Sequence, residues 1–254
     1  MSFRERETQP EHFDDPARTF DEFRVAYAQL ARVNRLFRLE DPYTRIMSAW
    51  LGHDECRELS ILDLGAGDGW LGEAIETWAA QRGWRWRVTN LDFNPAPLRL
   101  SRGARNVGGS ALALPFEDSS FDVVIASQMT HHFNSDEEVV QHFGEAWRVA
   151  GKGIFLTDMK RSRFLYAMLW LTLPLLRING TMRADGLLSV KKSWVVSDWR
   201  ELARRAGIPE AKVTSYYDSR VILAARKQPA SFATSETNGA CRATDGSCSA
   251  PSGR

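Results

Sequence analysis

Hydrophobic positions repeat at two different spacings along this chain, and the change of spacing divides it into two regions. Between Thr19 and about Trp50 the apolar residues recur every three or four positions, which is the period of an amphipathic helix. This pattern breaks near Pro42, because proline disfavours the helical conformation of the residue before it. Residues 1–18 are polar, and we expect them to be loose. Residues 1–54 are therefore predicted to form a helical lid.

After Glu58, short apolar runs alternate with stretches of helical period. The runs predict strands over Ser60–Leu64, Arg87–Asp92, Ala104–Val107, Phe121–Ala126 and Gly153–Asp158. The stretches predict helices over Gly69–Ala80, Pro95–Arg102 and Ser135–Val149, the last with Ser135 as its N-cap. Strands that alternate with helices indicate a mostly parallel sheet with right-handed crossovers.

The pattern changes again toward the C-terminus. A helix is expected over Asp198–Ala206 with Ser197 as its cap, followed by strand-like runs at Lys212–Tyr217 and Arg220–Ala225. Two strands joined so tightly predict an antiparallel edge hairpin. The expected fold class of residues 55–228 is thus α/β: a doubly wound, Rossmann-like, mostly parallel sheet of seven strands with a helical cap. The Ser- and Gly-rich residues 229–254 predict a disordered tail.

The expected cap, an insertion at about 161–195, contains the apolar segment Phe164–Leu176. This segment is shorter than the roughly 18–20 apolar residues that span a bilayer, so we expect no transmembrane segment. Three roles remain open for it. It can line an apolar acceptor pocket, pack the cap against the core, or, with the basic residues before it, make a peripheral contact with a membrane.

Composition excludes some classes of partner. The 33 basic and 32 acidic residues give a net charge of +1, which provides no general field for nucleic acid. The three cysteines, Cys56, Cys241 and Cys248, are too widely spaced for a metal cluster or a disulfide framework. We therefore expect a cytoplasmic protein without a metal centre.

The strongest local motif is a glycine-rich turn between a strand and a helix, containing Asp63, Gly65, Ala66, Gly67 and Gly69. Glycine lets a ligand approach the backbone closely, and the helix start adds free N–H groups. The spacing is G-x-G-x-G, whereas dinucleotide sites have G-x-G-x-x-G. A carboxylate two residues before the first glycine suits a ligand with an ammonium group.

A second acidic residue, Asp92, ends the next predicted strand. It follows Gly65 at about the distance at which an acidic residue binds ribose hydroxyls, and Phe93 beside it can lie against an adenine ring. The alternative is that Asp92 only caps the helix that begins near Pro95.

A third motif follows at 109–116 and 120–127, with the sequence "LPFEDSSFD" at its centre. With these three motifs in this order, residues 55–160 resemble the class I S-adenosylmethionine-dependent methyltransferases of the type 11 (ubiquinone/menaquinone methyltransferase-like) branch. The later segments resemble small-molecule methyltransferases associated with bacterial polyketide synthases.

The resemblance implies S-adenosyl-L-methionine as cofactor. It places Asp63 and the glycine loop around the methionine part and Asp92 on the ribose. Ser110 and Ala111 would lie beside the adenine. Ser127, which follows the fourth predicted strand, is the last of the expected cofactor-binding residues. Ser110 stands where many relatives have Asp, so we expect a weaker contact to the adenine amino group.

The acceptor site is expected after the fourth strand, where the crevice of such sheets opens. His131 and His132 lie there, and imidazole is the side chain best suited to take a proton near neutral pH. Adjacent histidines usually point in different directions, so we expect at most one to face the acceptor. Alternatively, both only pack or cap the next helix. Asp158, Lys160 and Tyr27 are weaker candidates.

The expected function is transfer of a methyl group to a small molecule in secondary metabolism, by O-methylation of a phenolic or polyketide-like acceptor. The alternatives are a catalytically silent cofactor-binding partner subunit and a C-methyltransferase of a quinone-like ring. The glycine spacing disfavours a nucleotide-dependent oxidoreductase. The missing basic arm disfavours an RNA substrate.

Overall fold

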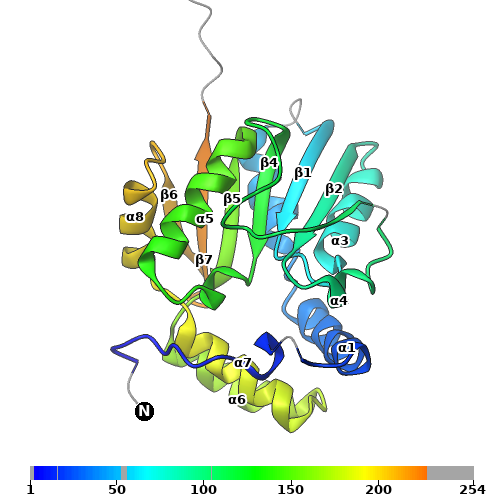
Figure 1. Cartoon of the computed structure of the whole chain (residues 1–254), viewed down its shortest axis with the longest axis vertical. Coiled ribbons are helices and arrows are strands. Elements are labelled where there is room, and N and C mark those ends of the chain that lie inside the picture. Colours follow the sequence, from blue (N-terminus) through cyan, green and yellow to red (C-terminus); the bar gives the residue numbers. More distant parts are fainter. Residues whose placement is uncertain (1–2, 16, 53–55, 104, 228–254) are drawn as a thin grey trace, which may run out of the picture.

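The computed structural model describes residues 3–15, 17–52, 56–103 and 105–227, and within them the chain forms one seven-stranded sheet (Figure 1). The strand order is β3-β2-β1-β4-β5-β7-β6. The strands are β1 Glu58–Leu64, β2 Arg85–Asp92, β3 Asn106–Gly108, β4 Phe121–Ser127, β5 Ala150–Met159, β6 Lys212–Tyr216 and β7 Arg220–Arg226. The predicted tail lies outside the described residues.

Strand pairing confirms the predicted fold class. The strands from β3 to β5 pair in parallel, in keeping with the crossover helices between them. The strand β7 runs antiparallel to both β5 and β6, which makes the edge hairpin. The parallel arrangement brings the carboxyl ends of β1, β2, β4 and β5 to one edge of the sheet, where a ligand crevice opens in such folds.

Helices cover both faces of the sheet (Figure 1). One face packs against α5 Asp136–Val149 and α8 Val196–Arg205, with Phe143 and Trp199 fully buried between them. The other face packs against α3 Trp70–Ala80 and the helical turns η2 Pro42–Met47 and α2 Ser48–Leu51. Burial of these apolar side chains on both faces is the main force that holds the sheet together.

A third layer lies below the carboxyl edge of the sheet (Figure 1). It contains α1 Phe20–Leu36, α6 Arg163–Leu175 and α7 Gly180–Lys192, which share a separate hydrophobic cluster. No described helix has both the length and the apolar character needed to cross a membrane. This layer encloses the crevice between itself and the sheet.

Several predicted elements differ from those observed. The helix α4 is shorter than predicted, at Pro95–Leu98. The helix α8 begins at Val196, so Ser197 lies inside it and is not its cap; the backbone N–H of Val195 donates to Asp198 instead. The sequence did not predict α7, because Gly180 and Gly186 weaken its helical pattern.

The expectation of a loose N-terminus is wrong for residues 3–15, which we call the N-terminal strap. The strap includes the short turn η1 His12–Asp14 and lies across α7, where the N–H of Glu7 donates to the carbonyl of Lys191 (3.2 Å). The Arg6 guanidinium donates to the carbonyl of Phe133 and stacks on the Trp194 ring at 4.1 Å. The polar residues of the strap are ordered because they have buried partners.

Candidate active site

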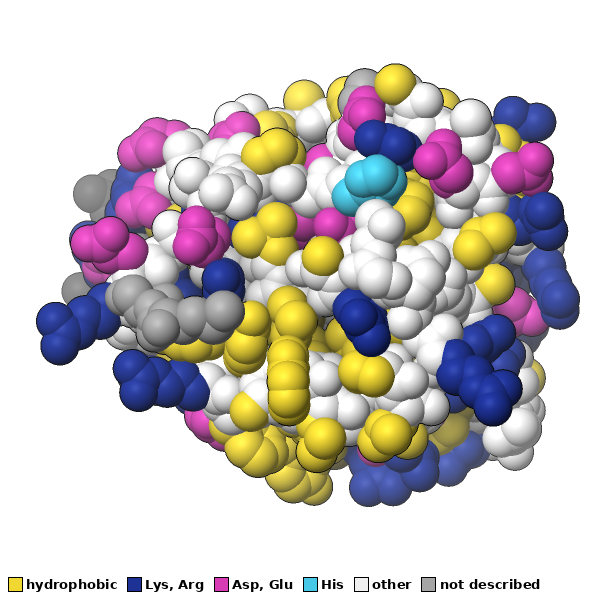
Figure 2. Space-filling model, turned by 90° about the horizontal axis from the view of Figure 1, so that it is seen from below, with side chains coloured by type: hydrophobic (Ala, Val, Ile, Leu, Met, Phe, Trp, Pro, Cys, Tyr) yellow, Lys and Arg dark blue, Asp and Glu magenta, His cyan; other side chains and the backbone are white. Residues whose placement is uncertain are grey.

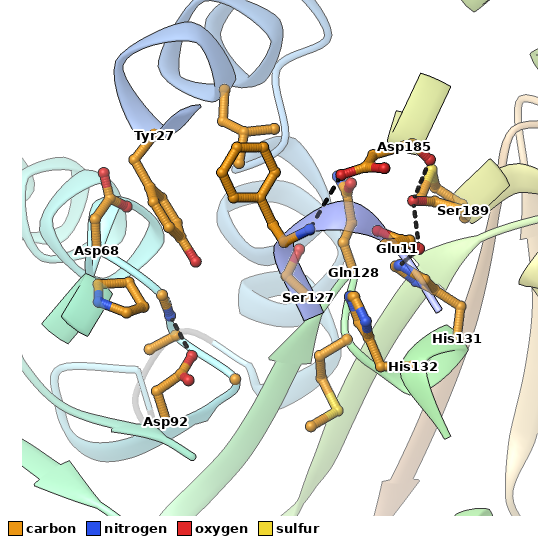
Figure 3. A pocket seen from close by; sticks show the side chains of 18 of the residues that line it. Glu11, Tyr27, Asp68, Asp92, Ser127, Gln128, His131, His132, Asp185 and Ser189 are labelled. Atoms are coloured by element: carbon orange, nitrogen blue, oxygen red, sulfur yellow. Dashed lines mark hydrogen bonds and ion pairs between the residues drawn. The ribbon is translucent and has the colours of Figure 1, made fainter. Parts of the chain in front are cut away.

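A cavity of about 840 Å³ lies between the carboxyl ends of the strands and the helices α1, α6 and α7. Figure 3 shows its two ends. Tyr27 and Asp92 lie at one end, which we call the cofactor end, and His131 and Ser189 lie at the other, which we call the acceptor end. The volume lies in the upper part of the range for small-molecule sites, so the cavity has room for more than a single small group.

The glycine loop forms the floor of the cofactor end. Gly65 and Gly67 have φ angles of +67° and +59°, which side chains other than glycine rarely adopt. A Cβ atom on Gly67 would lie only 2.6 Å from a ring carbon of Tyr27. Tyr27, which the sequence offered as a weaker candidate for the acceptor site, is on α1 and covers the cofactor end instead. Its ring leaves no room for a side chain at Gly67.

Asp63 is a buried acid without a complete set of partners. It is the last residue but one of β1, is 1% exposed, and its Oδ2 atom has no hydrogen-bond partner among the described residues. Burial, and then the neighbouring charge of Asp92, raise its pKa to about 8. Because a buried carboxylate is stable only when paired, this position calls for a cationic ligand.

Asp92 ties β2 to the glycine loop. Its Oδ2 accepts the N–H of Gly67 and its Oδ1 accepts the N–H of Asn94, both at 2.8 Å. Burial raises its pKa despite these hydrogen bonds. The alternative role as a helix cap is wrong, because Asn94 caps α4 by accepting the N–H of Ala96. Each oxygen of Asp92 keeps a lone pair for ligand hydroxyls.

Five of the other predicted cofactor residues line the cavity: Ala66, Phe93, Ser110, Ala111 and Ser127. The Phe93 side chain is 82% exposed at the rim of the cavity. The Ser110 hydroxyl accepts the N–H of Leu112 at 3.1 Å.

Gly69 does not line the cavity. A Cβ atom there would meet the Ser101 hydroxyl at 2.5 Å, so this glycine serves close packing at the start of α3 rather than ligand contact.

At the acceptor end, His131 forms a buried pair with Asp158. Its Nδ1 lies 2.8 Å from Asp158 Oδ1, and its backbone N–H donates to Asp158 Oδ2 at 2.7 Å. The Asp158 carboxylate can only accept, so Nδ1 is the nitrogen that donates to it. The other ring nitrogen, Nε2, faces Glu11 Oε1 at 3.6 Å. Two hydrogen bonds to one carboxylate therefore fix the orientation of His131.

His132 lies beside His131 rather than pointing away from it. Both are in the turn η3 Thr130–His132, and their ring centroids are 4.3 Å apart. The expectation of diverging directions is wrong, because each ring is held by its own carboxylate: Asp158 for His131 and Asp14 for His132 (2.8 Å). Burial opposes a charge on His132, but the hydrogen bond to Asp14 and the charge of Glu11 raise its pKa.

The strap and α7 contribute a group of charged residues that the sequence did not identify as part of the site. Lys192 is 1% exposed, and its Nζ lies 3.4 Å from Glu11 and 3.2 Å from Asp14. Ser189 donates to Glu11 at 2.8 Å, and Asp185 accepts the N–H of His12 at 3.0 Å. The spacing of residues 185, 189 and 192 places them on one face of a helix, which is the signal in the sequence that could have indicated this group. Their partners in the strap are too distant in the sequence to be predicted from it.

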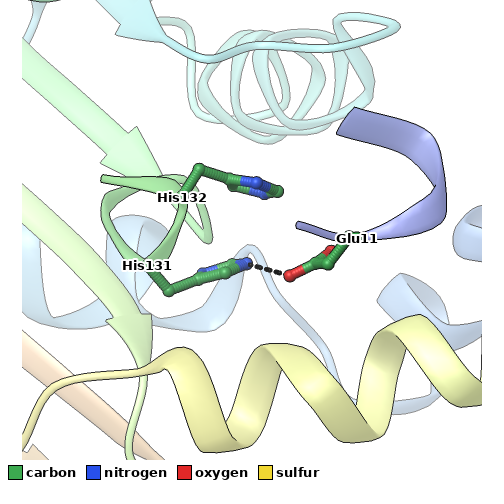
Figure 4. Close-up of side chains that lie close together, drawn as sticks. All are labelled: Glu11, His131 and His132. Carbon is green, nitrogen blue, oxygen red and sulfur yellow. Dashed lines mark ion pairs between the residues drawn. The ribbon is translucent and has the colours of Figure 1, made fainter. Parts of the chain in front are cut away.

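Three residues at this end have the donor atoms of a metal site. Ligand atoms of Glu11, His131 and His132 all lie within 4.8 Å of one another, and Figure 4 shows both rings directed toward Glu11. The Lys192 ammonium beside Glu11 already supplies the positive charge that a cation would bring. Lys160, the remaining weak candidate, pairs with Asp218 and is not among the cavity-lining residues.

The wall between the two ends is apolar. The cap residues that line it come from all three helices of the lower layer: Leu30, Val33, Leu165, Met168, Leu169, Leu173 and Met182. A molecule bound beside His131 therefore meets mostly hydrophobic side chains in this wall.

The sequence matches a known family over its central region. Residues 62–157 match the family model described as a methyltransferase domain, type 11. The matched stretch runs from β1 to β5 and includes the glycine loop, Asp92 and both histidines. No curated protein gives a significant match.

Solved structures resemble the fold. A SAM-dependent methyltransferase from Aquifex aeolicus is 14% identical with a TM-score of 0.53, covering 78% of this chain and 97% of its own. A SAM-dependent methyltransferase from Thermotoga maritima, described as a possible histamine N-methyltransferase, is 14% identical with a TM-score of 0.54, covering 81% and 100%. At these identities the similarity concerns the fold alone.

Proposed function

We propose that this protein, an S-adenosylmethionine-dependent methyltransferase with a class I, type 11 domain, methylates an oxygen of a small lipophilic acceptor in the cytoplasm. The reaction class and the cofactor follow from the matched domain. The observation that carries the choice of acceptor is the buried His131–Asp158 pair at one end of an otherwise apolar wall.

The residues of the cofactor end fit S-adenosylmethionine. The unpartnered Oδ2 of Asp63 matches its ammonium group, and the Asp92 oxygens match the ribose hydroxyls. Gly65 and Gly67 let the methionine part approach the backbone, while Ala111 and Phe93 border the place for the adenine. When bound, the cofactor supplies an electrophilic methyl group on its sulfonium.

The acceptor end can remove the proton that an attacking hydroxyl must lose. His131 Nε2 takes that proton, and Asp158 stabilises the resulting imidazolium through Nδ1. Glu11, 3.6 Å from Nε2, adds a second negative charge beside it. A phenolic or enolic hydroxyl is the acceptor group that this arrangement suits, because its acidity lies within reach of an imidazole base.

The cap excludes water and holds the rest of the acceptor. Alignment of the acceptor oxygen is most of what an enzyme must supply for a displacement on an activated carbon. The apolar wall favours a molecule with one polar ring and a hydrocarbon part, such as an alkylated phenol or a polyketide-derived ring.

The test is an incubation of the full chain with S-adenosylmethionine and a panel of phenols and enols that carry alkyl chains of increasing length. We expect S-adenosylhomocysteine and an O-methylated product by mass spectrometry, with kcat/KM rising with chain length. The methyl ethers of the same phenols serve as blocked controls. A product methylated on carbon would contradict O-methylation. Absence of turnover, with S-adenosylhomocysteine still bound, would favour the silent partner subunit.

A further inference from the structure

The helix α6, which closes the cavity from below, is hydrophobic on both of its sides. Its inward residues Leu165, Leu169 and Leu173 are buried in the cavity wall. Its outward residues are just as apolar but exposed, by 58, 65, 61 and 77% for Phe164, Trp170, Leu171 and Leu175. We call these four residues the outer face of α6.

The outer face is an unusual concentration of exposed hydrophobic side chains. It accounts for four of the eight large hydrophobic side chains that are exposed in the described part of the chain. Seen from below in Figure 2, hydrophobic side chains gather on this side of the molecule beside Lys and Arg side chains, and most acidic side chains lie elsewhere in the view. A contiguous apolar patch of this kind marks a surface that binds something.

Exposed arginines flank the outer face. Residues 160–192 contain seven basic residues and one acidic residue, the buried Asp185; of the seven, Lys160, Arg161 and Lys192 are paired with carboxylates. Arg163 begins α6, Arg177 follows its end, and Arg183 lies on α7; all three are exposed. Within the described ranges, none of these three arginines lies within ion-pair distance of a carboxylate. Their charges are therefore available to an anionic partner.

We propose that the outer face of α6 docks on an anionic lipid bilayer. A short helix with tryptophan, phenylalanine and leucine on one face and arginines at its ends is the pattern of a helix that lies flat in the membrane interface. Tryptophan favours the headgroup level, and the arginines can reach anionic lipids while their stems stay with the hydrocarbon.

The charge argues for a bilayer rather than a second copy of the chain. In a twofold dimer the same patch would face itself, which would bring Arg163, Arg177 and Arg183 of two copies together without intervening acids. Anionic headgroups, in contrast, complement these charges. The other side of α6 lines the cavity, so docking would place the cavity next to any acceptor dissolved in the membrane. Uptake of an acceptor from the membrane rests on the proposed function, whereas docking itself does not.

The test is flotation of the full chain with vesicles of phosphatidylcholine alone and with about one quarter phosphatidylglycerol. We expect clear binding to the anionic vesicles and at least about tenfold weaker partitioning to the neutral ones. The double variant Trp170→Ser, Leu175→Ser should lose at least about tenfold in partitioning. The variant Arg163→Gln, Arg177→Gln should lose a similar factor on anionic vesicles only.

The matched control is Tyr217→Ser, which removes a side chain as exposed as Leu175 (77%) but located between β6 and β7. It should bind vesicles like the wild type. All substituted residues are exposed, so thermal unfolding should stay unchanged and show that the variants fold.

Wild-type protein that floats with neither vesicle, or binding that survives both double variants, would overturn the proposal. So would a wild-type dimer in light scattering that Trp170→Ser, Leu175→Ser converts to a monomer. Calorimetric binding of S-adenosylhomocysteine and turnover of a short-chain, water-soluble phenol should be unchanged in both double variants. A failure of turnover in the wild type would count against the proposed function and not against docking.

Discussion

The two ends of the cavity handle buried charge in opposite ways. At the cofactor end, Asp63 is left with an unpartnered oxygen and a pKa raised to about 8. At the acceptor end, the buried Lys192 contacts both Glu11 and Asp14, and His131 is paired with Asp158. The cofactor end is therefore incomplete without a cation, whereas the carboxylates of the acceptor end already have partners within the chain.

The comparison predicts its largest effect at His131. Replacement by glutamine keeps a hydrogen-bonding side chain but removes the base, so kcat for O-methylation should fall by about 10²–10⁴-fold. Binding of S-adenosylhomocysteine should stay within about twofold of the wild type, because His131 lies at the other end of the cavity. Steady-state kinetics and calorimetry check the two parts. An unchanged kcat would remove His131 from the chemistry.

The second-largest effect is expected at Lys192 and concerns the stability of the fold. The variant Lys192→Met leaves the buried Glu11 and the partly exposed Asp14 without their ammonium partner and should cost about 3–5 kcal/mol, or release the strap so that protease cleaves it. Urea unfolding and limited proteolysis measure these outcomes. Lys191→Met is the matched control, since the Lys191 ammonium lies 5.9 Å from the Tyr166 ring and forms no ion pair with any carboxylate of the described residues. Equal behaviour of the two variants would argue that the pairing of Lys192 with the strap carboxylates does not stabilise the acceptor end.

An intermediate effect is expected at Asp63, with opposite signs for binding and stability. The variant Asp63→Asn should weaken binding of S-adenosylhomocysteine by about 10–100-fold, because the amide cannot pair with the ammonium group. Without ligand the variant should be more stable than the wild type at pH 9, where the wild-type carboxylate is ionised without a partner. Calorimetry and thermal unfolding test both. A loss of stability instead would mean that Asp63 has a partner within the fold.

The smallest effect is expected at Glu11. The variant Glu11→Gln removes the charge 3.6 Å from His131 Nε2 and should lower kcat by about tenfold. The KM for S-adenosylmethionine should stay unchanged. Ser189→Ala, which removes the hydroxyl that contacts both Glu11 and the carbonyl of Asp185 but leaves the Glu11 charge in place, is the milder comparison. A larger change in KM than in kcat would place Glu11 in cofactor binding instead.

The same contrast explains how much the sequence could predict. The order of strands and helices, the edge hairpin and the position of Asp63 and Asp92 follow from patterns that are local in the chain. Parallel strands then bring these strand ends together without any further information.

The acceptor end was only partly predictable, because its contacts join distant segments. Glu11 and Ser189 are 178 residues apart, and nothing in a polar, charged N-terminal segment signals that Glu11 becomes buried. The directions of His131 and His132 are set by Asp158 and Asp14, whose approach is a consequence of the fold and not of sequence neighbours.

The most direct test is calorimetric titration of the wild-type chain with S-adenosylhomocysteine at pH 7, in two buffers of different ionisation enthalpy. Asp63 with its pKa raised to about 8 is mostly protonated before binding and must ionise to pair with the ammonium group. We therefore expect release of about one proton on binding, and a Kd that falls as the pH rises toward 8 and then levels off. In Asp63→Asn both effects should vanish. No binding, or binding without proton release, would contradict an incomplete cofactor end.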